Sequence, residues 1–407
     1  MKKALYSFLL FASFSVQAQD DIVKNIIAEA TNNSQLEVLA HELLDVVGPR
    51  LTGTPQMKNA ADWAMQRYSG WGIKAKIHEF GEWQGWKRGI THIDMVSPRI
   101  RTLSGTQLAY SPSTTQGGVT AGLAVIPEVK NKEEFNAWLT TIKGKFVLSS
   151  MNQVTGRPDY NWEKFATPES YEKMKKDKSE ISRKWNANFR KMGVNRWNII
   201  KTLEEAGAAG ILSSNWAGGF GANRIFSAGT KKIPNIDLRV EDYSMLYRMV
   251  KSGVGPKIRV VSTSEDLGIV PTFNTLAEIK GVEKPDEYVI FSAHFDSWDG
   301  ATGTGTIVMM ETMRILKALY PNPKRTILVG HWGFEEGGLN GSRAFVEDFP
   351  EIVDNAQALF NQDNGTGRVV NISGQGFLNS YEYISKWLSP VPGKIKKHIK
   401  TDFPGMP

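Results

Sequence analysis

The sequence predicts an α/β fold in which a mixed, largely parallel sheet is flanked by helices and interrupted by an inserted α+β domain. Three runs of residues, 288–291, 326–330 and 358–360, are apolar without alternation, which is typical of central strands buried on both faces. Each run leads into polar residues. Because the carboxyl ends of parallel strands meet at one edge of a sheet, we expect these polar side chains to lie close together.

Candidate functional residues follow each of these strands. His294 and Asp296 follow the first strand, Glu335 and Glu336 the second, and Asp363 the third. Zinc hydrolases need nitrogen and oxygen ligands that leave a coordination position for water, and a carboxylate that takes a proton from that water. Asp296 is suited to accept a hydrogen bond from the ligand histidine or to brace the loop. The set therefore predicts a hydrolytic metal site.

The length and composition indicate a soluble globular protein with more than one domain. The chain has 407 residues, which is long for a single core, and it is 41% hydrophobic and 22% charged. The net charge of +7 is dispersed except over residues 172–192. A solvated helical face is expected there, with a docking surface for an acidic partner as the alternative. No nucleic-acid-binding motif is present, so no nucleic-acid partner is expected.

The N-terminus has the pattern of a signal peptide. Two of the first three residues are lysines, and residues 4–16 are mostly apolar. Val16 and Ala18 are small residues at the positions that precede a signal-peptide cleavage site. We predict cleavage after Ala18 and a secreted or periplasmic protein. The apolar run is too short to span a bilayer, so no stable membrane insertion is expected. The chain has no cysteine, which excludes disulfides and cysteine–zinc sites.

Helical periodicity and short strands divide the remaining chain. The spacing of apolar residues predicts helices over 22–30, 34–46 and 60–68, and alternation predicts a half-exposed strand over 73–77.

Near Pro98 the residue pattern changes to one typical of loops and short strands, such as 123–126, 145–149 and 258–261. Buried parallel strands resume at Leu276. We therefore predict an inserted domain over 98–270. It splits a catalytic domain formed by 19–97 and 271–407.

Three motifs resemble those of the co-catalytic dizinc aminopeptidase and carboxypeptidase family, peptidase family M28. They are AHFDSWD at 293–299, GFEEGGLNGS at 333–342 and NQD at 361–363. The chain looks closest to the carboxypeptidase Q branch, whose N-terminal segment resembles GPRLTG at 48–53. Residues 98–270 resemble the inserted protease-associated domain of that branch. The resemblance covers essentially the whole chain after the signal peptide.

The resemblance implies an exported zinc exopeptidase or dipeptidase that hydrolyses peptide bonds of small peptides. His294 and Asp363 would bind one zinc ion, Glu336 would bind the other, and Glu335 would be the general base. A catalytically inactive peptide-binding protein on the same scaffold is the alternative. The sequence leaves open whether the protein is an aminopeptidase, a carboxypeptidase or a dipeptidase, and whether it forms a homodimer.

The chain departs from the family pattern at two places. The family has a bridging aspartate between the His-x-Asp motif and the next helix, whereas residues 300–306 contain no carboxylate. The family's last zinc histidine has no counterpart, because His398 is expected to be a surface residue and His331 either a packed residue or a support behind the metal ligands. We therefore expect a C-terminally incomplete catalytic domain. Without the bridging charge, two dications would repel each other strongly, so at most one weakly held zinc ion is expected.

Overall fold

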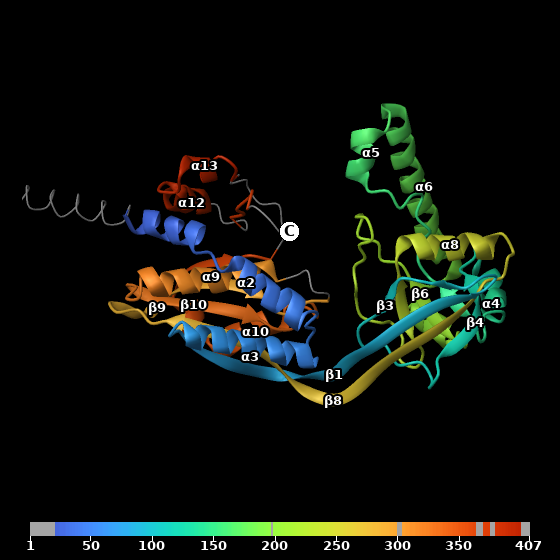
Figure 1. The fold of residues 1–407 in the computed structure, drawn as a ribbon, viewed down its shortest axis with the longest axis horizontal. Coiled ribbons are helices and arrows are strands. Elements are labelled where there is room, and N and C mark those ends of the chain that lie inside the picture. The colour runs from blue at the N-terminus through green and yellow to red at the C-terminus, as the bar shows by residue number, and fades with distance from the viewer. Residues whose placement is uncertain (1–20, 197, 299–302, 364–368, 375–378, 400–407) are drawn as a thin grey trace, which may run out of the picture. The chain divides into compact units, whose positions relative to one another are not determined.

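The computed structural model describes residues 21–196, 198–298, 303–363, 369–374 and 379–399 (Figure 1). The chain forms two compact units. Unit 1 comprises residues 1–52, 56–81 and 271–407, and unit 2 comprises 53–55 and 82–270. No helix of the described residues is long and apolar enough to cross a membrane. The predicted signal peptide over 1–18 lies outside the described residues.

The sheet of unit 1 has the strand order β11–β9–β10–β8. Its central strand β9 (Lys284–His294) pairs in parallel with β10 (Arg325–Trp332) on one side and with β11 (Ala356–Asn361) on the other. The three predicted central strands and their parallel arrangement are confirmed. In the observed register Trp332 pairs with His294 and Asn361 pairs with Ser292, so the three strands end at the same edge.

The strand β8 (Lys257–Ile279) corrects one prediction. The sequence predicted that the inserted domain ends at residue 270 and that parallel strands resume at Leu276, but β8 runs through this boundary and its Ala277 pairs with Val329 in antiparallel orientation. Leu276 and Ala277 are buried on opposite faces of the sheet. A strand buried on both faces has a continuous apolar run whether it pairs in parallel or antiparallel orientation. The sequence pattern therefore did not indicate which orientation β8 adopts.

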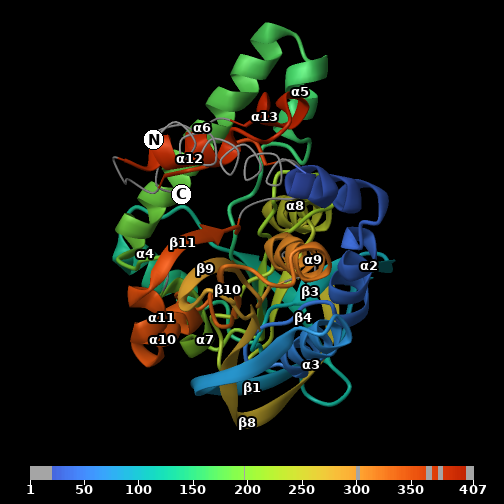
Figure 2. The same ribbon diagram turned by 90° about the vertical axis from the view of Figure 1, so that its left-hand side faces the viewer.

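Helices cover both faces of the unit 1 sheet. One face packs against α2 (Leu36–Ala40), α3 (Pro55–Gly70) and α9 (Thr304–Leu319), with Leu39, Tyr68 and Met310 among the buried residues. The other face packs against α10 (Asn340–Asp348) and α11 (Pro350–Asp354), which lie side by side (Figure 2). These apolar clusters hold the strand ends in fixed positions.

The N-terminal helices follow the predicted periodicity with one difference. Residues 21–32 are helical, and the predicted third helix lies within α3. The predicted helix over 34–46 instead consists of α2 followed by the wider π-helical segment η1 (His41–Val47), which ends at Gly48 with a φ of 77°. Towards the C-terminus, Trp387 of α12 (Ser380–Leu388) packs against Phe360 of β11. The short helix α13 (Gly393–Lys396) follows.

Unit 2 has its own mostly parallel sheet. The strand order is β8–β4–β5–β6–β7–β3. Outside this order, β1 (Lys74–Ser97) pairs with β2 (Arg101–Thr102) and with β8. The remaining strands are β3 (Gly105–Gln107), β4 (Val119–Val125), β5 (Phe146–Leu148), β6 (Gly210–Ser213) and β7 (Asn235–Leu238). The helices are α4 (Lys132–Leu139), α5 (Asp159–Phe165), α6 (Pro168–Met192), α7 (Ile199–Glu205) and α8 (Val240–Lys251). The assignment of 98–270 as an inserted protease-associated domain stays a prediction.

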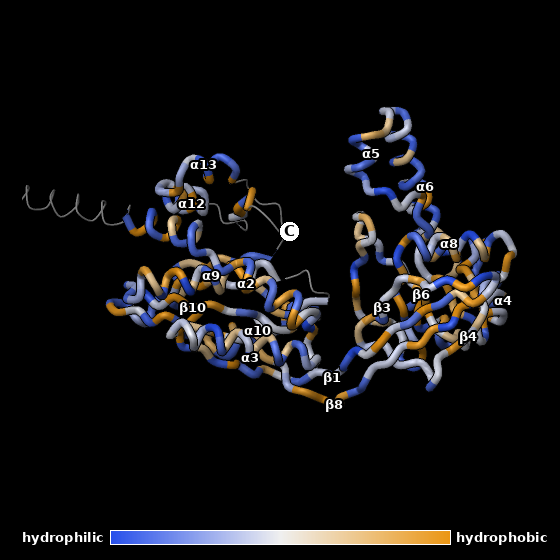
Figure 3. The backbone as a smooth tube through the Cα atoms, viewed as in Figure 1, coloured by the Kyte–Doolittle hydropathy of each residue, from blue (hydrophilic) through white to orange (hydrophobic). Residues whose placement is uncertain are grey.

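Helix α6 contains the basic segment that the sequence analysis identified. Most of its residues are exposed, and the tube in Figure 3 is largely hydrophilic there. Lys173 pairs with Asp177 and Lys184 with Glu180 at the surface. The predicted solvated helical face is confirmed.

Candidate metal centre

The common edge of β9, β10 and β11 brings the predicted metal-site residues together. His294 is the last residue of β9, and its ligand atoms lie within 4.8 Å of those of Glu335 and Glu336. Asp363 follows β11, and its Oδ1 atom lies 3.2 Å from His294 Nε2. The four side chains thus gather at one end of the sheet, and their roles as ligands or base stay predictions.

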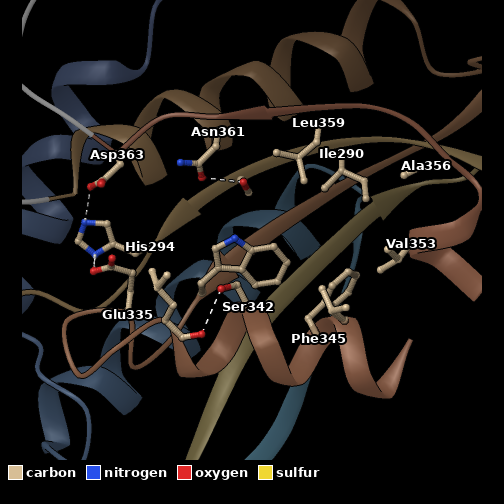
Figure 4. A pocket seen from close by; sticks show the side chains of 14 residues that line it. Ile290, His294, Glu335, Ser342, Phe345, Val353, Ala356, Leu359, Asn361 and Asp363 are labelled. Atoms are coloured by element: carbon tan, nitrogen blue, oxygen red, sulfur yellow. Dashed lines mark hydrogen bonds and ion pairs between the residues drawn. The ribbon is translucent and has the colours of Figure 1, made fainter. Parts of the chain in front are cut away.

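The imidazole of His294 lies between two carboxylates (Figure 4). Its Nδ1 atom donates to the backbone carbonyl of Asp296 at 2.8 Å and lies 3.9 Å from Glu335 Oε2, while Nε2 faces Asp363. Donation from Nδ1 leaves the lone pair of the neutral ring on Nε2. A hydrogen bond of this kind fixes the tautomer and the ring plane of a ligand histidine.

The Asp296 carboxylate braces the loop that carries the two glutamates. It is 1% exposed, and it accepts hydrogen bonds from the backbone N–H of Glu335 at 3.0 Å and of Glu336 at 3.3 Å. Its Oδ1 atom lies 3.9 Å from His294 Nδ1, too far for a hydrogen bond. Of the two roles that the sequence left open, the carboxylate therefore braces the loop, and the backbone carbonyl orients the histidine.

Burial and crowding shift the pKa values of these groups. Burial raises the pKa of Asp296 to about 6, against the hydrogen bonds that favour its ionised form. Burial also raises the pKa of Glu336 to about 7, although His294 and Trp298 favour its ionised form.

The histidine and Asp363 shift in the directions of an ion pair. Burial alone lowers the pKa of His294, but the Asp363 hydrogen bond and nearby carboxylates raise it to about 9. The same hydrogen bond lowers the pKa of Asp363. At pH 7 the site therefore retains a proton on the histidine to balance its acids.

The donor set fits a divalent cation. One imidazole nitrogen and several carboxylate oxygens are ligands that zinc uses in proteins. Burial raises the pKa of Glu336, and a dication bound beside it would favour its ionised form. Among the residues that the structure describes, His294, Glu335 and Glu336 are the one group of three or more His, Asp or Glu side chains with this spacing.

The sequence analysis did not identify three residues that form hydrogen bonds around the site. Trp298 Nε1 donates to Glu336 Oε2 at 2.5 Å, and Thr52 Oγ1 donates to Asp296 Oδ2 at 3.5 Å. Asn274 contacts the backbone of Gly333 and Gly341 beside the glutamates. Trp298 lies within the motif at 293–299 and Thr52 within the segment at 48–53, but nothing in the sequence connects Asn274 with the metal site.

Two histidines lie as predicted. His398 is exposed, and His331 is buried with Nε2 2.6 Å from the Tyr68 hydroxyl. The segment in which the bridging aspartate is expected includes residues 299–302, which lie outside the described residues. Residues 400–407 also lie outside them.

A pocket of about 330 Å³ opens beside the metal site (Figure 4). His294, Glu335 and Asp363 line its polar end. Its other walls are mostly apolar and include Ile290 and Phe345. The pocket makes the imidazole and the Glu335 carboxylate reachable for a ligand.

Known proteins share this sequence pattern and fold. Residues 274–403 match the sequence model of Peptidase family M28. Carboxypeptidase Q of Mus musculus is 26% identical over 359 residues, which cover 85% of this chain and 69% of that protein.

Two solved structures show the same fold. The peptidase M28 precursor from Shewanella amazonensis SB2B has a TM-score of 0.67 at 20% identity and covers 96% of this chain and 83% of that one. The zinc aminopeptidase BSAP from Bacillus subtilis has a TM-score of 0.54 at 18% identity and covers 87% of this chain and 77% of that one. Together with the residues gathered at the strand ends, the match over residues 274–403 and the similarity to carboxypeptidase Q support a metallopeptidase of peptidase family M28, near the carboxypeptidase Q branch.

Proposed function

We propose that this protein is an exported zinc exopeptidase or dipeptidase that hydrolyses small peptides, with Glu335 as the general base. The observation that carries this proposal is the position of Glu335. Its Oε2 atom lies 3.9 Å from His294 Nδ1, and Asp296 fixes its backbone N–H. The carboxylate is 25% exposed, so water and substrate can reach it.

We take the ligand roles from the family resemblance and compare them with the observed positions of the side chains. His294 Nε2 and Asp363 Oδ1, 3.2 Å apart, would hold one zinc ion, and Glu336 would be a ligand of the other where a second ion binds. When bound, zinc supplies a Lewis acid that polarises the substrate carbonyl and lowers the pKa of water. Glu335 then accepts the proton of the attacking water and donates it to the leaving amine, as a general base and acid does.

The other elements of the proposal concern the metal count, the middle domain and the location. The absence of a carboxylate from the sequence 300–306 favours one weakly held zinc ion and impaired activity. Residues 98–270 would be a protease-associated-like domain, and the signal peptide over 1–18 would direct the chain to the periplasm or the medium.

A catalytically inactive peptide-binding protein is the second candidate, favoured by the same missing carboxylate. Zinc analysis and a dipeptide hydrolysis assay on the 407-residue chain separate the two functions. Bound zinc with turnover supports the peptidase. Peptide binding without zinc and without turnover supports the alternative.

The role of Glu335 is tested by the substitution Glu335→Gln. We expect zinc content to be retained and dipeptide hydrolysis to be lost, because the amide cannot accept the water proton. The control is Glu347→Gln on the exposed face of α10. It removes one negative charge, as Glu335→Gln does, so the two variants have the same net charge. Hydrolysis by the Glu335→Gln variant at the rate of the unsubstituted protein would reject the assignment.

A further inference from the structure

The loop that carries Glu335 and Glu336 is closed at its neck by a side chain from another strand. We call residues 333–341 the glutamate loop. Asn274 of β8 is fully buried, and its Oδ1 atom accepts from Gly333 N–H at 2.9 Å. Its Nδ2 atom donates to the Gly341 carbonyl at 2.8 Å. One amide group therefore holds the first and last residues of the loop.

The neck is too tight for any residue except glycine. Gly341 N–H donates to the Gly333 carbonyl at 3.0 Å. A Cβ atom on Gly341 would lie 2.2 Å from the Gly333 carbonyl oxygen, and one on Gly333 would lie 2.1 Å from the Phe273 carbonyl oxygen. Distances this short cannot be tolerated next to backbone atoms. The two glycines thus permit the backbone contact that Asn274 secures.

His78 of β1 fixes which way the Asn274 amide points. The second N–H of Asn274 Nδ2 donates to His78 Nδ1 at 3.1 Å, so this ring nitrogen is the acceptor. His78 Nε2 then carries the proton and donates to Asp348 Oδ2 at 2.8 Å. A flipped amide would place its donor against Gly333 N–H and its oxygen against the Gly341 carbonyl. The arrangement has one orientation that satisfies all its partners.

The glutamate loop needs such support because its backbone is strained. Phe334 and Leu339 adopt left-handed φ values of 55° and 63°, which bulky residues rarely adopt. Strained residues of this kind persist only where the surrounding contacts fix them. Asp296 holds the peptide N–H groups of the two glutamates, and Asn274 holds the neck.

We propose that Asn274, oriented by His78, is a positioning residue for Glu335 and Glu336. The inference rests on the function proposed for these two glutamates. Asn274 contacts neither a substrate nor the proposed ligand atoms. It acts through the backbone of Gly333 and Gly341 and thereby sets the place of Glu336 as a ligand and of Glu335 as the base.

The first experiment compares Asn274→Ala with the unsubstituted chain. Without the amide, we expect faster hydrogen–deuterium exchange in residues 333–341 and zinc affinity about 10- to 100-fold weaker, the size of effect seen when a residue behind a metal ligand is removed. Where dipeptide hydrolysis is measurable, kcat should fall by a similar factor while KM changes little. Asn355→Ala, at an exposed asparagine, is the matched control and should change none of these quantities.

A second pair of variants tests the orientation by His78. His78→Asn keeps an acceptor near the former Nδ1 position, whereas His78→Leu removes it. We expect the leucine variant to show faster exchange of the glutamate loop and weaker zinc binding, and the asparagine variant to restore most of both. This pair decides the question if Asn274→Ala does not fold.

The results separate this inference from the proposed function. Unchanged loop exchange and zinc affinity in Asn274→Ala, or equal behaviour of His78→Leu and His78→Asn, would overturn the positioning role. A chain that neither binds zinc nor hydrolyses dipeptides would overturn the proposed function instead. Exchange of residues 333–341 would still show whether Asn274 closes the loop.

Discussion

His294 Nε2 lies 3.2 Å from Asp363 Oδ1, and this contact joins the ends of two parallel strands, β9 and β11. The two residues belong to segments that are far apart in the sequence. The register between the strands places them side by side. This ion pair raises the pKa of His294 and lowers the pKa of Asp363.

The first prediction concerns this ion pair. In protein freed of metal by a chelator, Asp363→Asn should lower the pKa of His294 from about 9, because the variant replaces the charged carboxylate acceptor that raises it with a neutral amide. Titration of the histidine ring protons by NMR measures the shift. A pKa that stays near 9 would contradict the contact. Asp354→Asn, outside the site, should leave the titration unchanged.

The second prediction concerns the pH dependence of metal binding. The pKa of His294 is raised to about 9, so at pH 7 zinc must displace a proton from the ring. Apparent zinc affinity should therefore rise as the pH increases from 7 towards 9. Calorimetry in buffers of different ionisation enthalpy measures the protons released. Binding with no proton release at pH 7 would argue against His294 as a ligand.

The third prediction concerns Trp298. Its indole N–H donates to Glu336 Oε2 at 2.5 Å and favours the ionised carboxylate. Trp298→Phe removes this donor, so we expect a higher pKa of Glu336 and zinc affinity about 10-fold weaker at pH 7. Metal-competition titrations give the affinity, with Trp387→Phe at a partly exposed tryptophan as the control. Equal affinity in both variants would show that the indole does not position Glu336.

The fourth prediction concerns stability and pH at His331. Burial lowers the pKa of this fully buried ring from 6.5 to about 3. The unfolded chain therefore binds a proton between pH 6.5 and 3 that the folded chain excludes. The neutral ring's contribution is fully present above pH 6.5 and is lost as the pH falls. Relative to pH 7, the loss at pH 4.5 is roughly 2 to 3 kcal/mol.

Urea unfolding at these two pH values measures this loss. His331→Gln cannot titrate, so the variant should lose less stability between pH 7 and pH 4.5 than the unsubstituted protein does. The variant's own packing defect is present at both pH values and cancels in the comparison. An identical pH dependence of the two proteins would show that His331 is protonated in the folded state.

Local patterns identified the central strands and the candidate site. The apolar runs at 288–291, 326–330 and 358–360 predicted the three parallel strands of unit 1 because full burial requires apolar side chains at successive positions. The polar residues that follow them predicted where the site lies, since parallel strands end at one edge. Both inferences depend only on residues that are neighbours in the chain.

Other features were decided by contacts between distant segments. The antiparallel direction of β8 depends on its pairing with β10, and an apolar run looks the same in both directions. The role of the Asp296 carboxylate depends on where the backbone of Glu335 and Glu336 returns to the sheet edge. Asn274 showed no functional signal in the sequence, because its role arises from partners on two other segments, β1 and the glutamate loop.

The sequence by itself thus determined the α/β class, the central strands and the chemical types gathered at their ends. These follow from burial and from side-chain chemistry, which local patterns carry. The tertiary structure alone decided that His294 faces Asp363, what Asp296 braces and how Asn274 closes the glutamate loop. Hydrogen bonds require donor and acceptor atoms within about 3 Å, and only the packed sheet brings these segments so close.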